Sequence, residues 1–367
     1  MLSNTQAFSE TASGFPTLCG ALDQPLMSTW NGLNLVVWLG NDVLQSWQTR
    51  ADENSLTLKL TDDEADDDGM RRLAALSALE SCFAQQPDRT TLKLQVHDVL
   101  ARMLLDDGTA LKTADGALEI SCERLWQQPD LWLRVPGNNG YAQQHIMSDG
   151  RRHPRRAPKP TGTVYTRYIP WLARTLSFRV ADIGEDLDRF HGWMNDPRVA
   201  QFWQEDGDLL KHRNYLESQL ADPHTIPLIG CFDGVPFGYF EVYWAKENRL
   251  GAYYDANDYD RGWHVLIGED SVRGRAWITA WLPSLVHYMF LDDHRTQRIV
   301  GEPRADHHQQ IRNLEKSGFS KIKEFDFPHK RAMLVMLLRE RFFADRLWID
   351  RTADQSRASM TDHGSGQ

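Results

Sequence analysis

The chain has 367 residues, of which 41% are apolar and 25% are charged, and its formal net charge is −10. This composition is typical of a soluble globular protein and excludes a fibrous or largely disordered chain. The negative charge argues against a nucleic-acid partner, because phosphate binding requires concentrated positive charge. The length exceeds one average domain, so we expect two domains.

The cysteines and the start of the chain bear on the compartment. Cys19, Cys82, Cys122 and Cys231 show no paired spacing, so neither a disulfide framework nor a zinc site is expected. The first residues, MLSNTQAFSE, lack the basic and apolar blocks of a signal peptide, and no apolar run approaches the length of a membrane span. We therefore expect a cytoplasmic protein with no membrane partner.

In the first part of the chain, short apolar runs alternate with a helical stretch. We expect strands over 33–39, 56–60 and 92–96, and a helix over 70–85. The acidic run 62–68 is expected to be an exposed loop, because a helix N-terminus tolerates anions; a metal site is the less favoured alternative. The pattern predicts a smaller α/β domain over 1–150, in which no catalytic constellation is evident.

A basic, proline-rich stretch over 151–165 is expected to separate two domains. Its first charged residues are Arg151, Arg152, Arg155, Arg156 and Lys159. Prolines interrupt this charge, which predicts an exposed, extended linker, with a phosphate or partner contact as the alternative. At the other end, residues 348–367 have the composition of a polar tail.

Residues 166–347 show the element order of one compact α+β domain. LSFRVAD alternates as a strand, two helices follow, and an Asp-Gly turn at 233–234 predicts a hairpin. The next strand, WHVLIGE, leads into VRGRA and a helix over 277–290, in which Pro283 predicts a kink. A strand at RIVGE, a helix over 306–316 and two last strands complete the order.

The VRGRA loop has the chemistry of a pyrophosphate site. Arg273 and Arg275 bring positive charge, Gly274 allows backbone N–H groups to approach a ligand, and the helix terminus adds its dipole. Taken alone, the loop fits an ordinary strand-to-helix turn better.

Several long strings in this half occur in a fixed order: HGWMNDPRVAQFW, PLIGCFDGVPFGYFEVYWA, DRGWHVLIGE, VRGRA, RTQRIVGEPRAD and KIKEFDFPHKR. Together they resemble the GNAT-type acyltransferases of hydroxamate siderophore pathways, and within that family the N6-hydroxylysine acetyltransferases. The resemblance is strong over about 160–345 and faint upstream, so the N-terminal domain inherits no function from it.

The resemblance implies a C-terminal GNAT fold with a splayed mixed sheet, and a degenerate GNAT-like half is one interpretation of the preceding domain. It implies acetyl-CoA or succinyl-CoA as acyl donor, an N-hydroxylated amine as acceptor, and no metal. A siderophore synthetase or monooxygenase of the same pathway is the implied protein partner.

Two catalytic residues follow from the resemblance. His264 matches the family's proposed base, since a histidine with a pKa near neutrality can take the proton lost by the attacking nitrogen. Strand alternation places it on the face opposite Trp263 and Val265. Asp306 matches the acidic partner that would orient or charge-stabilise the imidazole. The alternatives are a core histidine and a helix N-cap.

The resemblance also implies binding residues on both sides of the reaction. For the cofactor they are Leu266, Ile267, Gly268, Val272, Arg273, Gly274, Arg275, Ala276 and His307. For the substrate they are Trp193, Asn195, Trp203, Glu241, Tyr243 and Trp244. The amide of Asn195 can orient a hydroxylamine and indoles can cover an alkyl chain, although Asn195 equally fits a helix end before Pro197.

Two positions depart from the family pattern. His307 stands where the family usually has asparagine. Leu314 stands where many GNAT enzymes carry the tyrosine that protonates the leaving thiolate, so that acid is absent.

We therefore expect direct acetyl transfer to N6-hydroxylysine, because no cysteine or serine lies in these motifs as a nucleophile. The alternatives are acetylation or succinylation of N-hydroxyputrescine or N-hydroxycadaverine, and a non-catalytic acyl-CoA-binding partner of a synthetase. An aminoglycoside acetyltransferase is disfavoured, since its polycationic substrate asks for an acidic cleft and these motifs are aromatic.

Overall fold

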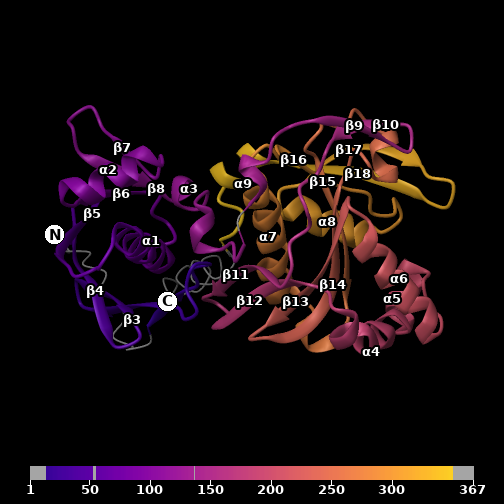
Figure 1. Ribbon diagram of the computed structural model, residues 1–367, viewed down its shortest axis with the longest axis horizontal. Coiled ribbons are helices and arrows are strands. Elements are labelled where there is room, and N and C mark those ends of the chain that lie inside the picture. Colours follow the sequence, from indigo (N-terminus) through magenta and orange to yellow (C-terminus); the bar gives the residue numbers. More distant parts are fainter. Residues whose placement is uncertain (1–13, 53–54, 136, 350–367) are drawn as a thin grey trace, which may run out of the picture. The chain divides into compact units, whose positions relative to one another are not determined.

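The computed structural model describes residues 14–52, 55–135 and 137–349, which divide into two compact units (Figure 1). The first unit runs to Arg134 and also includes Thr166–Pro170, while the second comprises Val135–Tyr165 and continues from Trp171. The division near Arg134 differs from the expected boundary at residue 150. Of the expected tail, residues 350–367 lie outside the described residues.

The first unit is built on one mostly antiparallel sheet. Its strands are β1 (Phe15–Thr17), β2 (Leu26–Asn31), β3 (Asn34–Leu39), β4 (Asp42–Ala51), β5 (Leu56–Asp63), β6 (Thr91–Gln95), β7 (Ala110–Lys112) and β8 (Leu118–Ser121). Its helices are α1 (Asp68–Gln85), α2 (Asp98–Asp106) and α3 (Cys122–Leu125). The sheet order is β1-β2-β3-β4-β5-β6-β8-β7, and α1 is the crossover between the parallel strands β5 and β6. The predicted strands and helix of this half are confirmed.

The second unit repeats this arrangement and adds a separate two-stranded sheet. Its strands are β9 (His145–Ser148), β10 (Arg151–Pro154), β11 (Thr163–Ile169, which spans the division), β12 (Arg174–Val180), β13 (Thr225–Phe232), β14 (Val235–Trp244), β15 (Arg261–Ile267), β16 (Arg298–Gly301), β17 (Ser320–Asp326) and β18 (Arg331–Leu338). Its helices are α4 (Ile183–Met194), α5 (Pro197–Trp203), α6 (Leu209–Ala221), α7 (Arg275–Asp292), α8 (His308–Lys316) and α9 (Arg339–Ala344). The main sheet has the order β11-β12-β13-β14-β15-β16-β18-β17.

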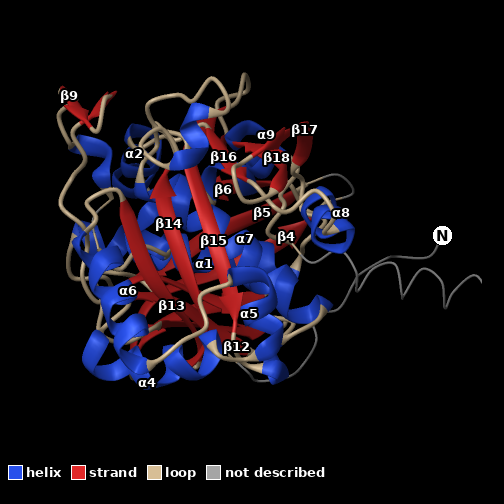
Figure 2. Cartoon of the chain, turned by 90° about the vertical axis from the view of Figure 1, so that its right-hand side faces the viewer, coloured by secondary structure: helices blue, strands red, loops and turns tan. Residues whose placement is uncertain are grey.

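The predicted element order of this half is confirmed, with one addition. Pro197 ends α4 as expected but then opens α5, because proline is tolerated at the first position of a helix. Pro283 lies inside α7 as predicted. Figure 2 shows β13, β14 and β15 side by side with α4, α5 and α6 around them. Among the described residues no helix combines the length and apolar character needed to cross a membrane.

The basic stretch is not the exposed linker that its composition predicts. Arg151–Pro154 pairs with β9, and His153 is fully buried. Arg156 donates to both carboxylate oxygens of Glu247, at 2.5 and 2.8 Å. The Lys159 ammonium donates to four backbone carbonyls, those of Gln219, Leu220, Asp222 and Thr225. The prediction was wrong because these cations satisfy carbonyls and a carboxylate within the second unit.

Two apolar clusters cover one face of the second sheet. The first contains Leu187, Phe190, Trp193, Leu216, Tyr239 and Leu266, and the second contains Tyr243, Leu250, Val300, Phe327 and Leu334. On β14, Glu241 lies between Tyr239 of the first cluster and Tyr243 of the second, and it pairs with His264 on β15. The packing therefore leaves one polar position between two apolar ones.

Candidate active site

The parallel strands β15 and β16 separate soon after they meet. They are paired only through Arg261 with Ile299 and Gly262 with Val300. On the other side, β15 stays bonded to β14 as far as Gly268, whose N–H donates to the carbonyl of Phe237 at 3.0 Å. A splayed pair of strands is therefore present, as the sequence predicts.

Strand alternation decides which backbone groups of β15 point into the gap. Because Gly268 bonds to β14, the N–H groups of Val265 and Ile267 are directed to the β16 side. The carbonyls of these two residues accept from Trp203 Nε1 at 3.1 Å and from Arg273 Nη2 at 2.8 Å. The N–H groups are thus the backbone groups of this edge suited to receive a ligand oxygen.

The imidazole of His264 lies between two buried carboxylates. Nδ1 is 2.8 Å from Glu241 Oε2, and Nε2 is 2.9 Å from Glu302 Oε1. Because ionised carboxylates only accept hydrogen bonds, both ring nitrogens donate and the ring is an imidazolium. The His264 side chain remains 26% exposed. It is thus a charged group that a ligand can reach.

The charges of this cluster stabilise one another. Burial lowers the pKa of His264, but Glu302 and Glu241 outweigh it and raise this pKa to about 9. Burial raises the pKa of Glu302, but the charge and hydrogen bond of His264 bring it down to about 2. The expected histidine pKa near neutrality is therefore wrong, since the resting ring has no free lone pair to act as a base.

Three tyrosines fix the two carboxylates. The hydroxyls of Tyr215 and Tyr239 donate to Glu241 Oε1 at 2.5 and 3.1 Å, and the hydroxyl of Tyr243 donates to Glu302 Oε2 at 2.9 Å. Burial, followed by the adjacent carboxylate charge, holds the pKa of Tyr243 well above its usual range, so it stays a donor. Glu241 and Tyr243, expected to contact substrate, instead support His264.

Asp306 is not the partner of His264. Its carboxylate is 69% exposed and accepts from Arg304 at 2.8 and 3.0 Å. Nor does it cap α8, because the N-cap is His307, whose Nδ1 accepts from the N–H of Gln310 at 3.1 Å. His307, predicted to contact the cofactor, is therefore a helix cap. The acid beside His264 is Glu302, which directly follows β16 at the place where the two strands separate.

Of the predicted indoles, Trp203 alone lies beside His264, with ring centroids 6.2 Å apart. Trp193 is buried beneath the cofactor loop, where Nε1 donates to Glu269 at 3.0 Å. A Cβ added to Gly268 would lie 2.2 Å from the Trp193 ring, so only glycine fits there. Trp193 is thus a support for Gly268 and not a wall of the substrate site.

Asn195 and Trp244 also lie away from the imidazole. The amide of Asn195 ends α4 and exchanges hydrogen bonds with the backbone of Gly207 at 2.9 and 3.0 Å, as its structural alternative predicts. Trp244 follows Tyr243 on the strand and so projects from the opposite face, where the guanidiniums of Arg156 and Arg261 each lie 4.1 Å from its ring. Neither residue is placed to contact a substrate at His264.

The predicted cofactor loop leads to an open helix terminus. After β15, a short turn over Asp270–Val272 brings the chain to Gly274, the N-cap of α7. Gly274 has a φ of 96° and ψ of −179°, and no side chain caps the helix. The first N–H groups of α7, beginning at Arg275 and Ala276, are therefore available to an anion, with Arg273 beside them. The side chain of Leu266, also predicted to bind the cofactor, belongs instead to the apolar core.

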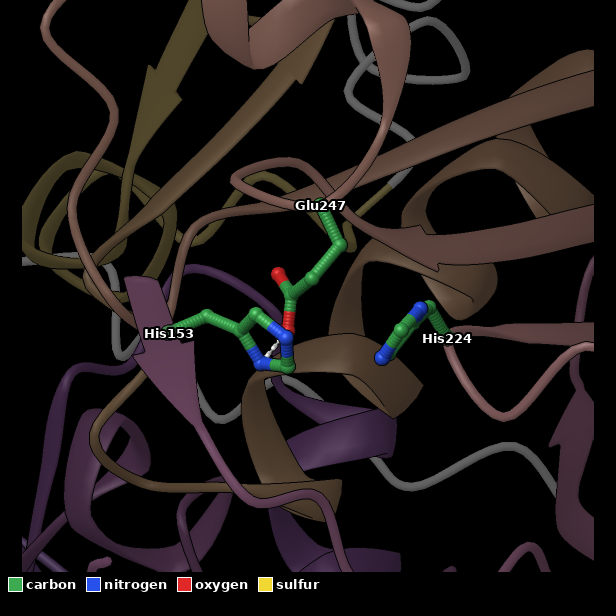
Figure 3. Close-up of side chains that lie close together, drawn as sticks. All are labelled: His153, His224 and Glu247. Atoms are coloured by element: carbon green, nitrogen blue, oxygen red, sulfur yellow. Dashed lines mark ion pairs between the residues drawn. The ribbon is translucent and has the colours of Figure 1, made fainter. Parts of the chain in front are cut away.

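One group in the described part of the chain has the spacing of metal ligands, formed by His153, His224 and Glu247 (Figure 3). His153 Nδ1 lies 2.9 Å from Glu247, and its Nε2 is buried without a hydrogen-bond partner among the described residues. However, the guanidinium of Arg156 already binds both oxygens of Glu247. A cation would have to displace this charge, so we interpret the group as an ion-pair network.

Glu241 and Glu302 were missed as partners of His264. The signal for Glu302 is its position directly after the RIVG strand, at the carboxyl end of a parallel strand. The signal for Glu241 is its alternation with Tyr239 and Tyr243, but its register opposite His264 depends on the hairpin.

The comparisons with known proteins agree with this geometry. Residues 182–327 match the acetyltransferase (GNAT) domain family. The N(6)-hydroxylysine O-acetyltransferase of Escherichia coli is 38% identical over 91% of this chain and 96% of its own length. A putative lysine N-acyltransferase of Schizosaccharomyces pombe is 42% identical over 63% of this chain and 69% of its own length.

A longer relative matches the second half. The N(5)-hydroxyornithine:cis-anhydromevalonyl coenzyme A-N(5)-transacylase of Beauveria bassiana is 48% identical over 52% of this chain, but this match spans 43% of that protein. Together with the splayed strands, these relatives show that the chain is an acyltransferase and belongs to the GNAT family that contains the hydroxylysine and hydroxyornithine acyltransferases of siderophore biosynthesis.

Proposed function

We propose that this enzyme transfers an acetyl group from acetyl-CoA to the hydroxylated side-chain nitrogen of N6-hydroxylysine and so forms a hydroxamate. The observation that carries the proposal is the charged His264, held between two carboxylates at the point where β15 and β16 separate. The Escherichia coli relative, named for N(6)-hydroxylysine, supports this acceptor because its match extends over both units.

The donor is proposed to bind along the gap that β15 and β16 leave between them. The N–H groups at the start of α7, with Arg273 and Arg275, suit a pyrophosphate. The N–H groups of Val265 and Ile267 suit the thioester oxygen, where negative charge develops during transfer. Trp203 suits the alkyl chain of the acceptor, because its ring lies beside His264.

We propose that His264 moves a proton from nitrogen to sulfur. Transfer forms the nitrogen–carbon bond and breaks the carbon–sulfur bond of the thioester. The imidazolium donates a ring proton to the departing thiolate, a role for which no tyrosine stands at Leu314, and the neutral ring then accepts the proton released by the acylated nitrogen. A hydroxylamine nitrogen is weakly basic, so it needs no base before it attacks.

Direct transfer is favoured over a covalent enzyme intermediate. Cys231 is the one cysteine of the second unit, and it is 2% exposed. Burial raises the pKa of its thiol, so the reactive thiolate is suppressed. A siderophore synthetase, or the monooxygenase that supplies the hydroxylated amine, is the proposed pathway partner.

The test is a thiol-release assay with acetyl-CoA or succinyl-CoA and a set of acceptors. The acceptors are N6-hydroxylysine, N-hydroxycadaverine, N-hydroxyputrescine and lysine, and the product is detected by its coloured ferric complex. We expect hydroxamate from N6-hydroxylysine with acetyl-CoA. Thiol release without a ferric complex would indicate O-acylation, and CoA binding without turnover would indicate a non-catalytic acyl-CoA-binding module.

A further inference from the structure

A small hollow in the second unit carries side chains of both charges. Its volume is about 200 Å³, and it is lined by Ser148, Asp149, Arg151, His224, Glu247 and Arg249. Arg156 already neutralises Glu247. Asp149 and Arg249 carry opposite charges, and each can bind a ligand group of the other sign. Such a lining suits a zwitterion better than a simple cation.

Arg249 links this hollow to the candidate active site. Its Nη2 lies 4.0 Å from Glu302 Oε1, the same oxygen that accepts from His264 Nε2 at 2.9 Å. The guanidinium and the imidazole therefore flank a single carboxylate oxygen. A ligand that occupies the hollow beside Arg249 is within a short chain length of His264.

The guanidinium of Arg249 is weakly engaged in this structure. Its side chain is 51% exposed, and its one ion pair among the described residues is the 4.0 Å contact with Glu302. The neighbouring cation, Lys330, lies 5.5 Å from the centre of the Phe327 ring, on which Arg249 also lies at 5.3 Å, and its ammonium donates to the backbone carbonyl of Glu302 at 2.8 Å. The Arg249 guanidinium, in contrast, has no hydrogen bond among the described residues and can still bind a carboxylate.

We propose that Arg249 binds the α-carboxylate of an N-hydroxylated amino acid and thereby selects amino acids over diamines. This inference rests on the proposed function. Six bonds separate the side-chain nitrogen of lysine from its carboxylate carbon, which corresponds to roughly 7 Å in an extended chain. The acceptor nitrogen then lies at His264, the carboxylate lies at Arg249, and the α-ammonium faces Asp149.

A diamine of the same length would place a second ammonium beside Arg249. Like charges at close range repel each other, so the same guanidinium that attracts a carboxylate disfavours the diamine. Arg249 is therefore inferred to determine specificity, while His264 performs proton transfer for either acceptor.

The experiment compares the wild type with Arg249→Gln on N6-hydroxylysine and on N-hydroxycadaverine, which lacks the carboxylate. We expect kcat/KM for N6-hydroxylysine to fall roughly ten- to hundredfold, mainly through KM, because a charged hydrogen bond is lost. For N-hydroxycadaverine, kcat/KM is expected to stay the same or to rise, because the variant removes the charge that repels its second ammonium. Arg331→Gln is the matched control, since Arg331 is exposed and pairs with Glu324 instead.

Equal losses for both acceptors, or no loss for either, would overturn the inference, because Arg249 would then act through Glu302 or not at all. Calorimetric binding of both compounds to the CoA-loaded protein separates this inference from the proposed function. If the wild type makes no hydroxamate but binds N6-hydroxylysine more tightly than Arg249→Gln does, the proposed function fails and the carboxylate site is retained. If it makes hydroxamate and Arg249→Gln binds both compounds as the wild type does, the carboxylate site fails.

Discussion

The two units of this chain share a strand order but differ at the places where chemistry occurs. In both, an antiparallel meander leads to a pair of parallel strands joined by a long helix, which is β5, α1 and β6 in the first unit and β15, α7 and β16 in the second. In both sheets the last two strands then occur in reversed order at the edge, as β8-β7 and β18-β17. The interpretation of the first unit as a degenerate GNAT-like half is therefore consistent with its topology.

The helix termini of the two units differ in charge. In the first unit, Asp67 caps α1 and accepts from the N–H of Met70 at 2.8 Å, after an acidic run. In the second, Gly274 leaves the terminus of α7 open beside Arg273. An anion is therefore repelled from the first terminus and attracted to the second.

The gaps between the parallel strands also differ. In the first unit, Asp63 at the end of β5 binds His97, which follows β6, at 2.7 Å. Asp63 also binds Arg71 of α1 at 2.8 Å. In the second, the histidine lies within the strand and is held by two carboxylates. The comparison shows that two units with the same strand order carry different charged groups at two corresponding places.

The largest expected effect is the loss of His264, compared with the loss of His97 in the first unit. His264→Ala is expected to lower kcat roughly 10²- to 10⁴-fold, because it removes the group that moves the proton, while leaving CoA binding unchanged. His97→Ala in the first unit is the matched control and should leave kcat unaltered. Steady-state kinetics and calorimetry with CoA measure both. Full turnover by the His264 variant would remove this histidine from the mechanism.

A second variant tests whether the carboxylates keep His264 charged. Wild-type kcat should fall as pH rises through about 9, the raised pKa of the imidazolium. Glu302→Gln removes one stabilising charge, so this fall should begin at a pH roughly one to two units lower. Asp63→Asn in the first unit should not move the profile. A profile that is the same in wild type and Glu302→Gln would contradict the proposed proton transfer.

The same raised pKa predicts a pH dependence of stability. Because the folded-state pKa of about 9 exceeds the unfolded value near 6.5, this histidine contributes stability that is fully present below pH about 6.5. The contribution is lost as pH rises through about 9. Denaturant unfolding of wild type and His264→Ala across this range measures it, and parallel curves would contradict the assignment.

A third variant gives the second unit the acidic cap of the first. Gly274→Asp is expected to raise the Kd for CoA roughly tenfold, since a carboxylate competes for the N–H groups that a phosphate requires. Gly274→Ala shares the strain of a side chain at a φ of 96° but adds no charge, so the difference between the two variants isolates the electrostatic effect. Equal Kd values for the two variants would exclude it.

The smallest effect is expected at Asp306. Its pairing with Arg304 is exposed and screened by solvent, and it does not involve His264, so Asp306→Asn should change kcat by less than roughly fivefold and clearly less than Glu302→Gln. Both variants are compared at one pH with saturating substrates. A larger loss in the Asp306 variant would restore this aspartate to the reaction.

The fold of the second unit was largely predictable because each strand and helix carries its own periodicity. The helix α5 was not, because Pro197 is equally typical of a helix that ends and of one that begins. The boundary near Arg134 was not, since the pairing of β9 with β10 assigns the basic stretch to the second unit.

The candidate site was predictable in part. His264 and the open terminus at Gly274 follow from local sequence. The partners Glu241 and Glu302 depend on hairpin register and on where two distant strands separate, which no local pattern determines. Strand alternation could have excluded Trp244 from the residues around His264, since it follows Tyr243 and must face the other side of the sheet.

The contact between Trp193 and Gly268 has a consequence for protein engineering. A residue in the apolar core of α4 supports the backbone at the entrance to the cofactor loop. Repacking α4 would therefore disturb the backbone at Gly268 together with the core, because one indole supports both. A substitution at Trp193 would therefore be felt at two places, the apolar core and the turn that follows β15.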